Sequence, residues 1–323
     1  MTGNERVRAV IDGRKPDRMP VYGWVRANLE EPISERFGSV EAFEDRYEFD
    51  LSHLFGGPER YRKADLDAIR ERKGQIEPAD LLEIPLTDPR DPAAYAGLEE
   101  AVRFHKHDRG RFVYVQTHGV FEAHNGFFGI ENHLMYLLLY PEDLSRVYAR
   151  QAEWTAAFAD VCLDLGIDMI HVSDDWGSQR GLLFSPEVFT SLIVPHHRPV
   201  ADLVRSRGGY LSLHSDGNIV PALPSILDLG FNVVHPWQES AGMSYDLFER
   251  DYRGRFAVMG GIDVQTTIGF GDPNRVRREV GALIDRFRDG GLILCTTHFV
   301  QDHCTIDELV DAFDFIHEKV RGR

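Results

Sequence analysis

The chain has 323 residues, of which 43% are hydrophobic, and 36 Lys and Arg stand against 52 Asp and Glu, so its formal net charge is -16. This length suits one large α/β domain. The acidic balance argues against binding to nucleic acid or to an anionic membrane surface, because both require a basic patch. Small molecules or a less acidic protein are the expected partners.

Short apolar segments bounded by Gly, Pro or Asp recur along the chain and predict eight strands. They lie at 21–26, 50–56, 111–119, 168–174, 209–215, 231–237, 256–261 and 292–298. Between them are segments with helical spacing, such as 185–208 and 272–291, which open with Ser-Pro or Asp-Pro and close with glycine. This alternation predicts an α/β fold, a (β/α)8 TIM barrel that covers residues 1–323 as a single domain. An open doubly wound sheet is the alternative, but no dinucleotide fingerprint or P-loop supports it.

The segment 58–110 interrupts this rhythm with many charges and, after Pro58, four further prolines. Because it follows the second predicted strand, we expect an excursion over the mouth of the barrel. It is either a lid or a solvated insertion.

The three cysteines, Cys162, Cys295 and Cys304, are an odd number and poor material for a disulfide framework. The charged N-terminal residues lack the apolar core of a signal peptide, and the longest apolar run, 133–140, is too short to span a bilayer. A soluble protein in the reducing cytoplasm is expected.

Polar side chains gather where the predicted strands end. In a barrel these ends surround one cavity, in which the active site lies. The residues concerned are Arg26, Asn28, Thr117, His118, Glu122, Asp174, Asp175, Trp176, His214, Asp216, His235, Trp237, Gln238, Asp263 and His298.

The stretch LSLHSDG places His214 and Asp216 on the same face of the chain, because strand side chains alternate. With His298, they form a set of two imidazoles and one carboxylate that leaves a coordination position open, as catalytic zinc and non-haem Fe(II) sites do. The H-x-D spacing is common by chance, so a hydrogen-bonded histidine is the alternative interpretation.

Asp174 and Asp175 are adjacent and therefore face opposite ways, so only one of them is expected in the cavity. That aspartate is a candidate acid or base. Its neighbour would cap a helix or pair with an arginine. Trp176 and Trp237 would wall a flat ligand or simply pack in the core.

Five segments together resemble the uroporphyrinogen decarboxylase (URO-D) superfamily, and within it the branch of corrinoid-dependent methyltransferases. These are residues 4–21, 173–195, 213–238, 260–268 and 290–309. The resemblance implies a (β/α)8 barrel. The decarboxylases carry an R-Q-A-G-R segment after the first strand and an aspartate after the second. Here the corresponding segments read VRANLEEP, with Arg26 alone, and SHLFGGPE, with no aspartate, which disfavours tetrapyrrole decarboxylation.

In the methyltransferase branch, zinc is held by a His-x-Cys pair and a third ligand after the last strand. The resemblance assigns these roles to His214, Asp216 and His298, and replacing thiolate by harder ligands suits activation of oxygen or nitrogen. It implies an O-demethylase or N-demethylase that passes the methyl group to a corrinoid, a methylcobamide or cobalamin. A partner protein would carry this corrinoid, since the chain has no D-x-H-x-x-G loop.

The remaining roles complete this hypothesis. Glu122 and one of Asp174 or Asp175 would orient or protonate the leaving group. Substrate-binding roles fall to Arg26, His118, His235, Trp237 and Gln238. The alternatives are a cofactor-free carboxy-lyase of the uroporphyrinogen decarboxylase type and a non-catalytic ligand-binding barrel.

Overall fold

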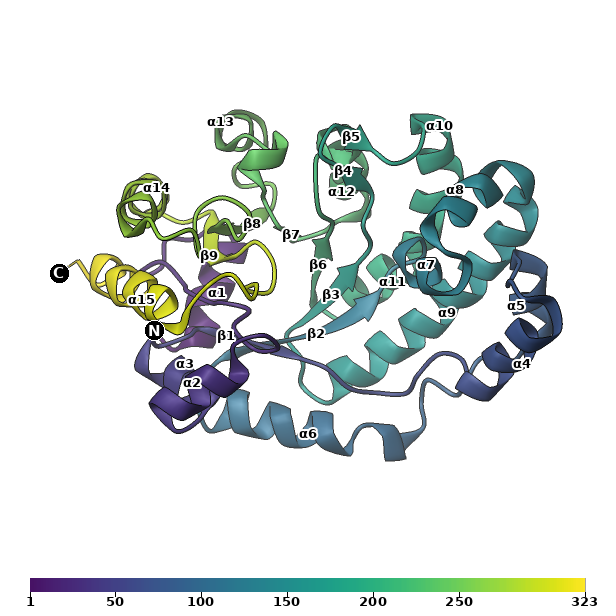
Figure 1. The fold of residues 1–323 in the computed structure, drawn as a ribbon, viewed down its shortest axis with the longest axis horizontal. Coiled ribbons are helices and arrows are strands. Elements are labelled where there is room, and N and C mark those ends of the chain that lie inside the picture. Colours follow the sequence, from purple (N-terminus) through teal and green to yellow (C-terminus); the bar gives the residue numbers. More distant parts are fainter. Residues whose placement is uncertain (323) are drawn as a thin grey trace. The chain divides into compact units, whose positions relative to one another are not determined.

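The computed structural model describes residues 1–322, and these residues form two compact units (Figure 1). The first unit consists of Met1–His53, Phe104–Val113 and the described part of Asn232–Arg323. The second unit consists of Leu54–Arg103 and Tyr114–Phe231. A single domain over residues 1–323 stays a prediction.

The second unit is built on parallel strands with helices packed against them. β2 pairs with β3, and β3 pairs with β6, both in parallel, and α9 and α11 pack against β3 and β6. Its elements are α4 (Lys63–Lys73), α5 (Pro78–Glu83), α6 (Ala96–Val102), β2 (Phe112–His118, whose first two residues belong to the first unit), α7 (Glu122–Phe128), α8 (Ile130–Leu139), α9 (Pro141–Asp164), β3 (Met169–Ser173), β4 (Gly177–Ser178), β5 (Gly181–Leu182), α10 (Pro186–Val188), α11 (Val194–Ser206), β6 (Tyr210–His214) and α12 (Leu223–Leu229). The expected excursion at 58–110 thus carries three short helices, α4 to α6.

The first unit repeats the same arrangement. β8 pairs in parallel with β7 and with β9, and α14 packs against α15. Its elements are α1 (Gly3–Ile11), α2 (Glu30–Phe37), α3 (Val40–Arg46), β1 (Leu51–Leu54, whose last residue belongs to the second unit), β7 (Val233–His235), α13 (Tyr245–Leu247), β8 (Ala257–Ile262), α14 (Pro273–Arg286), β9 (Leu292–Thr296) and α15 (Ile306–Val320).

Helices begin at the signals that the sequence offers. Asp272 accepts a hydrogen bond from the Arg275 amide and is followed by Pro273 at the first position of α14. Thr305 and Glu308 form a capping box at the start of α15. None of the helices within residues 1–322 combines the length and apolar character that a bilayer crossing requires.

Seven of the eight predicted strands are present, as β1, β2, β3, β6, β7, β8 and β9. The chain is therefore an α/β protein whose intra-unit pairings are parallel, apart from the small β4–β5 hairpin. The strand predicted at 21–26 is reduced to an isolated bridge between Val21 and Leu294. These described residues do not confirm a closed ring of eight strands.

The short bridge has a local cause. Backbone hydrogen bonds join the segment around Val21 to Leu294 of β9. The next amide of this segment that would continue the ladder, that of Trp24, donates instead to the Thr296 hydroxyl at 2.9 Å. A side chain thus replaces the backbone acceptor that a strand would need.

We expect Thr296→Val to destabilise the protein by ~1–3 kcal/mol, because it leaves the buried Trp24 amide without its acceptor. Urea unfolding would measure the change. Thr190→Val is the control, because Thr190 lies exposed on a helix and its loss should cost less than ~0.5 kcal/mol. Equal effects in the two variants would refute this explanation of the interrupted strand.

Candidate active site

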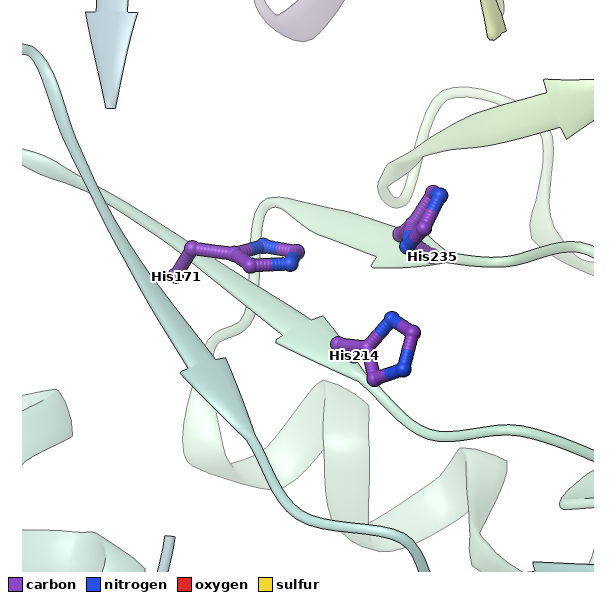
Figure 2. Close-up of side chains that lie close together, drawn as sticks. All are labelled: His171, His214 and His235. Carbon is purple, nitrogen blue, oxygen red and sulfur yellow. The ribbon is translucent and has the colours of Figure 1, made fainter. Parts of the chain in front are cut away.

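The register of the second unit's strands lines up polar side chains near their carboxyl ends. His118 of β2 is level with Ser173 of β3, and Ser173 is level with His214 of β6. His171 is two residues before Ser173, so it points to the same face. Figure 2 shows the His171 and His214 rings projecting from their neighbouring strands, with ring centroids 5.9 Å apart.

Asp174, directly after β3, is fully buried and caps α7. Its carboxylate accepts hydrogen bonds from the amides of Val120, Phe121 and Glu122, at 3.2, 2.9 and 2.6 Å. It also accepts from the Trp176 indole at 2.9 Å and from His197 Nε2 at 2.8 Å. These contacts supply the cap that α7 lacks from its own residues.

The tight fit around Asp174 explains the glycine at position 119. A Cβ atom on Gly119 would lie 2.3 Å from Cβ and Cγ of Asp174. Burial alone would raise the pKa of Asp174. The hydrogen bond and charge of His197, with the Glu122 amide and the Trp176 indole, outweigh burial and hold the pKa below its ordinary value.

Asp175 has a different environment, although it is the next residue. It is partly exposed, and its Oδ1 accepts from the Asp216 amide at 2.8 Å. This bond joins the segment after β3 to the segment after β6 and places the Asp216 carboxylate. Burial raises the pKa of Asp175, and the charge of Asp174 adds to this effect.

Glu122, the first residue of α7, is the second carboxyl group with a raised pKa. Burial and the charge of Asp175 raise the pKa of Glu122 to about 7, although a hydrogen bond from the Ser173 hydroxyl at 2.8 Å opposes them. Asp174 thus stays ionised, while Glu122 can take up or release a proton near neutral pH. Carboxyl groups with pKa values separated in this way are suited to acid and base roles.

His214 and Asp216 can bind one ion together. His214 Nε2 lies 3.8 Å from Oδ1 of Asp216 and 3.8 Å from Oδ1 of Asp175. A divalent ion with bonds of ~2.0–2.2 Å can bridge a nitrogen and an oxygen at this separation. The imidazole and carboxylate pair of the second unit thus comprises two of the three predicted metal ligands.

The other predicted site residues lie in the first unit, where each has its own contacts. Arg26 forms ion pairs with Glu41 and Glu44, at 2.9 and 3.0 Å. His235 Nε2 donates to the Thr296 carbonyl at 3.2 Å, and its ring packs on Trp24.

Trp237, Gln238 and His298 follow the ends of β7 and β9. Trp237 is buried and lines a pocket of about 470 Å³ within the first unit. Gln238 donates to the Gln265 side chain at 3.0 Å. Burial lowers the pKa of His298, against a hydrogen bond with the Phe299 backbone. The three-residue set with His298 stays a prediction, since His298 belongs to the first unit and the other two residues to the second.

Sequence reasoning missed His171 and Ser173. His171 Nδ1 hydrogen-bonds with the Ser212 hydroxyl at 2.6 Å, and Ser173 holds the Glu122 carboxyl group. The available signal was their spacing, because both are polar residues on one face of an otherwise apolar strand.

Comparisons with known proteins identify one family model and several structures with a similar fold. The family model described as Uroporphyrinogen decarboxylase (URO-D) matches residues 124–319. No curated protein sequence is significantly similar to the chain. A methyltransferase from Methanosarcina mazei has a TM-score of 0.67 at 16% identity, over 99% of both chains. A B12-independent methionine synthase from a Shewanella species, solved with selenomethionine, has a TM-score of 0.46 at 12% identity, over 70% of this chain and 67% of that chain.

Glu122→Gln should change how stability depends on pH. The folded pKa of Glu122 is about 7 and its ordinary value is 4.5. Protonated Glu122 therefore contributes to the free energy of unfolding in full below about pH 4.5, and this contribution is lost as pH rises through 7. Relative to the wild type, the variant should therefore gain up to ~3 kcal/mol between these pH values. Urea unfolding across this range would measure the gain. The exposed Glu131→Gln should show none, and a pH-independent difference for Glu122→Gln would contradict the shift.

The two aspartates should respond differently to loss of charge. Asp174→Asn breaks a buried carboxylate–histidine contact and offers an amide to five donors, so we expect a loss of ~3–5 kcal/mol in unfolding free energy. Asp175→Asn keeps an acceptor for the Asp216 amide and should cost about 1 kcal/mol or less. Denaturant unfolding of both variants tests this, and similar losses would show that Asp174 is not the structural member of the pair.

Proposed function

This chain belongs to the uroporphyrinogen decarboxylase (URO-D) family, and we propose that within it the chain acts as a methyltransferase with a partner corrinoid protein. Its substrate would be a small methoxylated or N-methylated compound. The fold shared with the Methanosarcina mazei methyltransferase is compatible with this activity.

The observation that carries the proposal is the pair of His214 Nε2 and Asp216 Oδ1, which lie 3.8 Å apart at the carboxyl end of β6. These two residues, with His298 as the third ligand assigned from the sequence, would hold a zinc ion. When bound, this ion supplies Lewis-acid chemistry that lowers the negative charge on the oxygen or nitrogen that loses its methyl group. A nitrogen and oxygen ligand set suits such hard substrate atoms better than a thiol.

The proton on the leaving atom would come from Glu122. A carboxyl group with a pKa of about 7 is close to half protonated at neutral pH, so it can donate a proton and later recover it. Asp175 positions Asp216 through the Asp216 amide, and Asp174 holds the start of α7, where Glu122 lies. Substrate contacts are assigned to His118, His235, Trp237 and Gln238.

Decarboxylation of a porphyrinogen is less well supported. That reaction requires cations for several substrate carboxylates, and Arg26, the arginine at the family's first-strand position, is already paired with two glutamates. The three cysteines are free and buried, which agrees with a reducing compartment such as the cytoplasm.

His214→Ala and Asp216→Asn test the metal site. We expect about one zinc ion per wild-type chain, and a loss of zinc affinity in each variant that exceeds the ~10–100-fold typical of an outer-shell partner. Elemental analysis would measure zinc, and demethylation of methoxylated and N-methylated donors with reduced cobalamin as acceptor would measure activity. His107→Ala, at an exposed histidine, should keep both. Full zinc content and activity in the two site variants would overturn the proposal.

A further inference from the structure

Arg60 brings a positive charge from the start of the excursion to the beginning of α7. Its Nη2 donates to the Ala123 carbonyl at 3.3 Å, and its guanidinium carbon lies 6.0 Å from the centre of the Phe127 ring. Ala123 is the residue after Glu122, and the charge of Glu122 acts on the pKa of Arg60.

The other terminal nitrogen of Arg60 has no hydrogen-bond partner in the described part of the chain. Nη1 is buried, and among residues 1–322 no acceptor lies within hydrogen-bonding distance of it. None of the described carboxylates lies within the 4.0 Å of an ion pair with Arg60 either. A buried donor on a charged group is costly when it is unpaired, so such a group is normally satisfied in the functional state.

Glu122 does not supply the missing anion. Its pKa is raised by burial and by Asp175, whereas a direct ion pair with Arg60 would lower it. Burial lowers the pKa of Arg60 to about 10, which still leaves the guanidinium charged at neutral pH. Its charge also lowers the pKa of His118, after the larger effect of desolvation. The unpaired cation therefore lies among the residues to which substrate contact and proton transfer are assigned.

We propose that Arg60 binds a carboxylate group of the substrate, so that the methyl donor is a small methylated carboxylic acid. This inference rests on the proposed function for the methyl group, but the carboxylate site is argued from Arg60 alone. A guanidinium binds a planar carboxylate through two parallel N–H bonds that come from two different nitrogens. In Arg60, Nη1 has both hydrogens free, and Nη2 donates one hydrogen to the Ala123 carbonyl and has a second for the other bond.

Binding of benzoate and of its neutral analogue benzamide to the full chain, measured by calorimetry, tests the inference without any turnover. We expect the wild type to prefer benzoate by about 10- to 100-fold, the range for hydrogen bonds to a charged group. Arg60→Gln should bind the two compounds equally. Arg60→Lys, which keeps the charge but not the planar fork, should keep part of the preference.

Arg70→Gln is the matched control, because Arg70 also comes from the excursion and donates to an α7 carbonyl, that of Gly126, at 3.2 Å, but is exposed. It should keep the wild-type preference. A wild type that does not prefer benzoate, or an Arg60→Gln variant that still does, would overturn the proposal. Where Arg60→Gln does not fold, Arg60→Lys with an undiminished preference would overturn it equally.

Tighter binding of phenyl phosphate than of benzoate would replace the carboxylate by a phosphate and so overturn the substrate class. A protein with the Arg60-dependent preference that transfers no methyl group would support the carboxylate site and remove only the methyltransferase proposal.

Discussion

The candidate site of the second unit depends on one buried carboxylate, that of Asp174. Three backbone amides, one indole and one imidazole donate to it, and they come from the start of α7, from the segment after β3 and from α11. A buried charge is tolerated only when its hydrogen bonds are satisfied. Because these donors must converge on Asp174, the end of β3, the first turn of α7 and the side of α11 are held together, and Glu122 is placed as a consequence.

The Asp174 carboxylate also affects the pKa values of its neighbours Asp175 and Glu122. Asp174 accepts five hydrogen bonds and stays ionised, so its negative charge acts on Asp175 and Glu122. Asp175 accepts from the Asp216 amide, and Glu122 accepts from the Ser173 hydroxyl and the Asp175 backbone. Their pKa values rise as a result of burial and of these neighbouring charges. Asp174 therefore has a structural role because it accepts most of the hydrogen bonds. Asp175 and Glu122 accept fewer, so their carboxyl groups can exchange protons.

Strand positions could be predicted from the sequence, because a short apolar segment between turn residues is typical of a buried strand. Seven of the eight predicted strands are present in the structure. The failure at 21–26 arises from the Thr296 hydroxyl, more than 270 residues away in sequence, which takes the Trp24 amide. The same-face placement of His214 and Asp216 follows from strand alternation alone. The choice between Asp174 and Asp175 did not follow from sequence, because the decisive donors come from Val120, Phe121 and other residues remote in the chain.

Charge explains why a cation from the excursion matters in this protein. At ~6 Å and an effective dielectric constant of ~20, two like charges repel by about 3 kcal/mol, so an anionic substrate beside several carboxylates would be disfavoured. Protonation of Glu122 near pH 7 removes one of these charges, and Arg60 opposes the others. The segments after the strands and the start of α7 thus carry the carboxylates, and the excursion carries the cation. Arg60 could not be identified from the ends of the predicted strands, because it lies in the excursion. Its role depends on the Nη1 atom without a hydrogen-bond partner, which folding brings to α7.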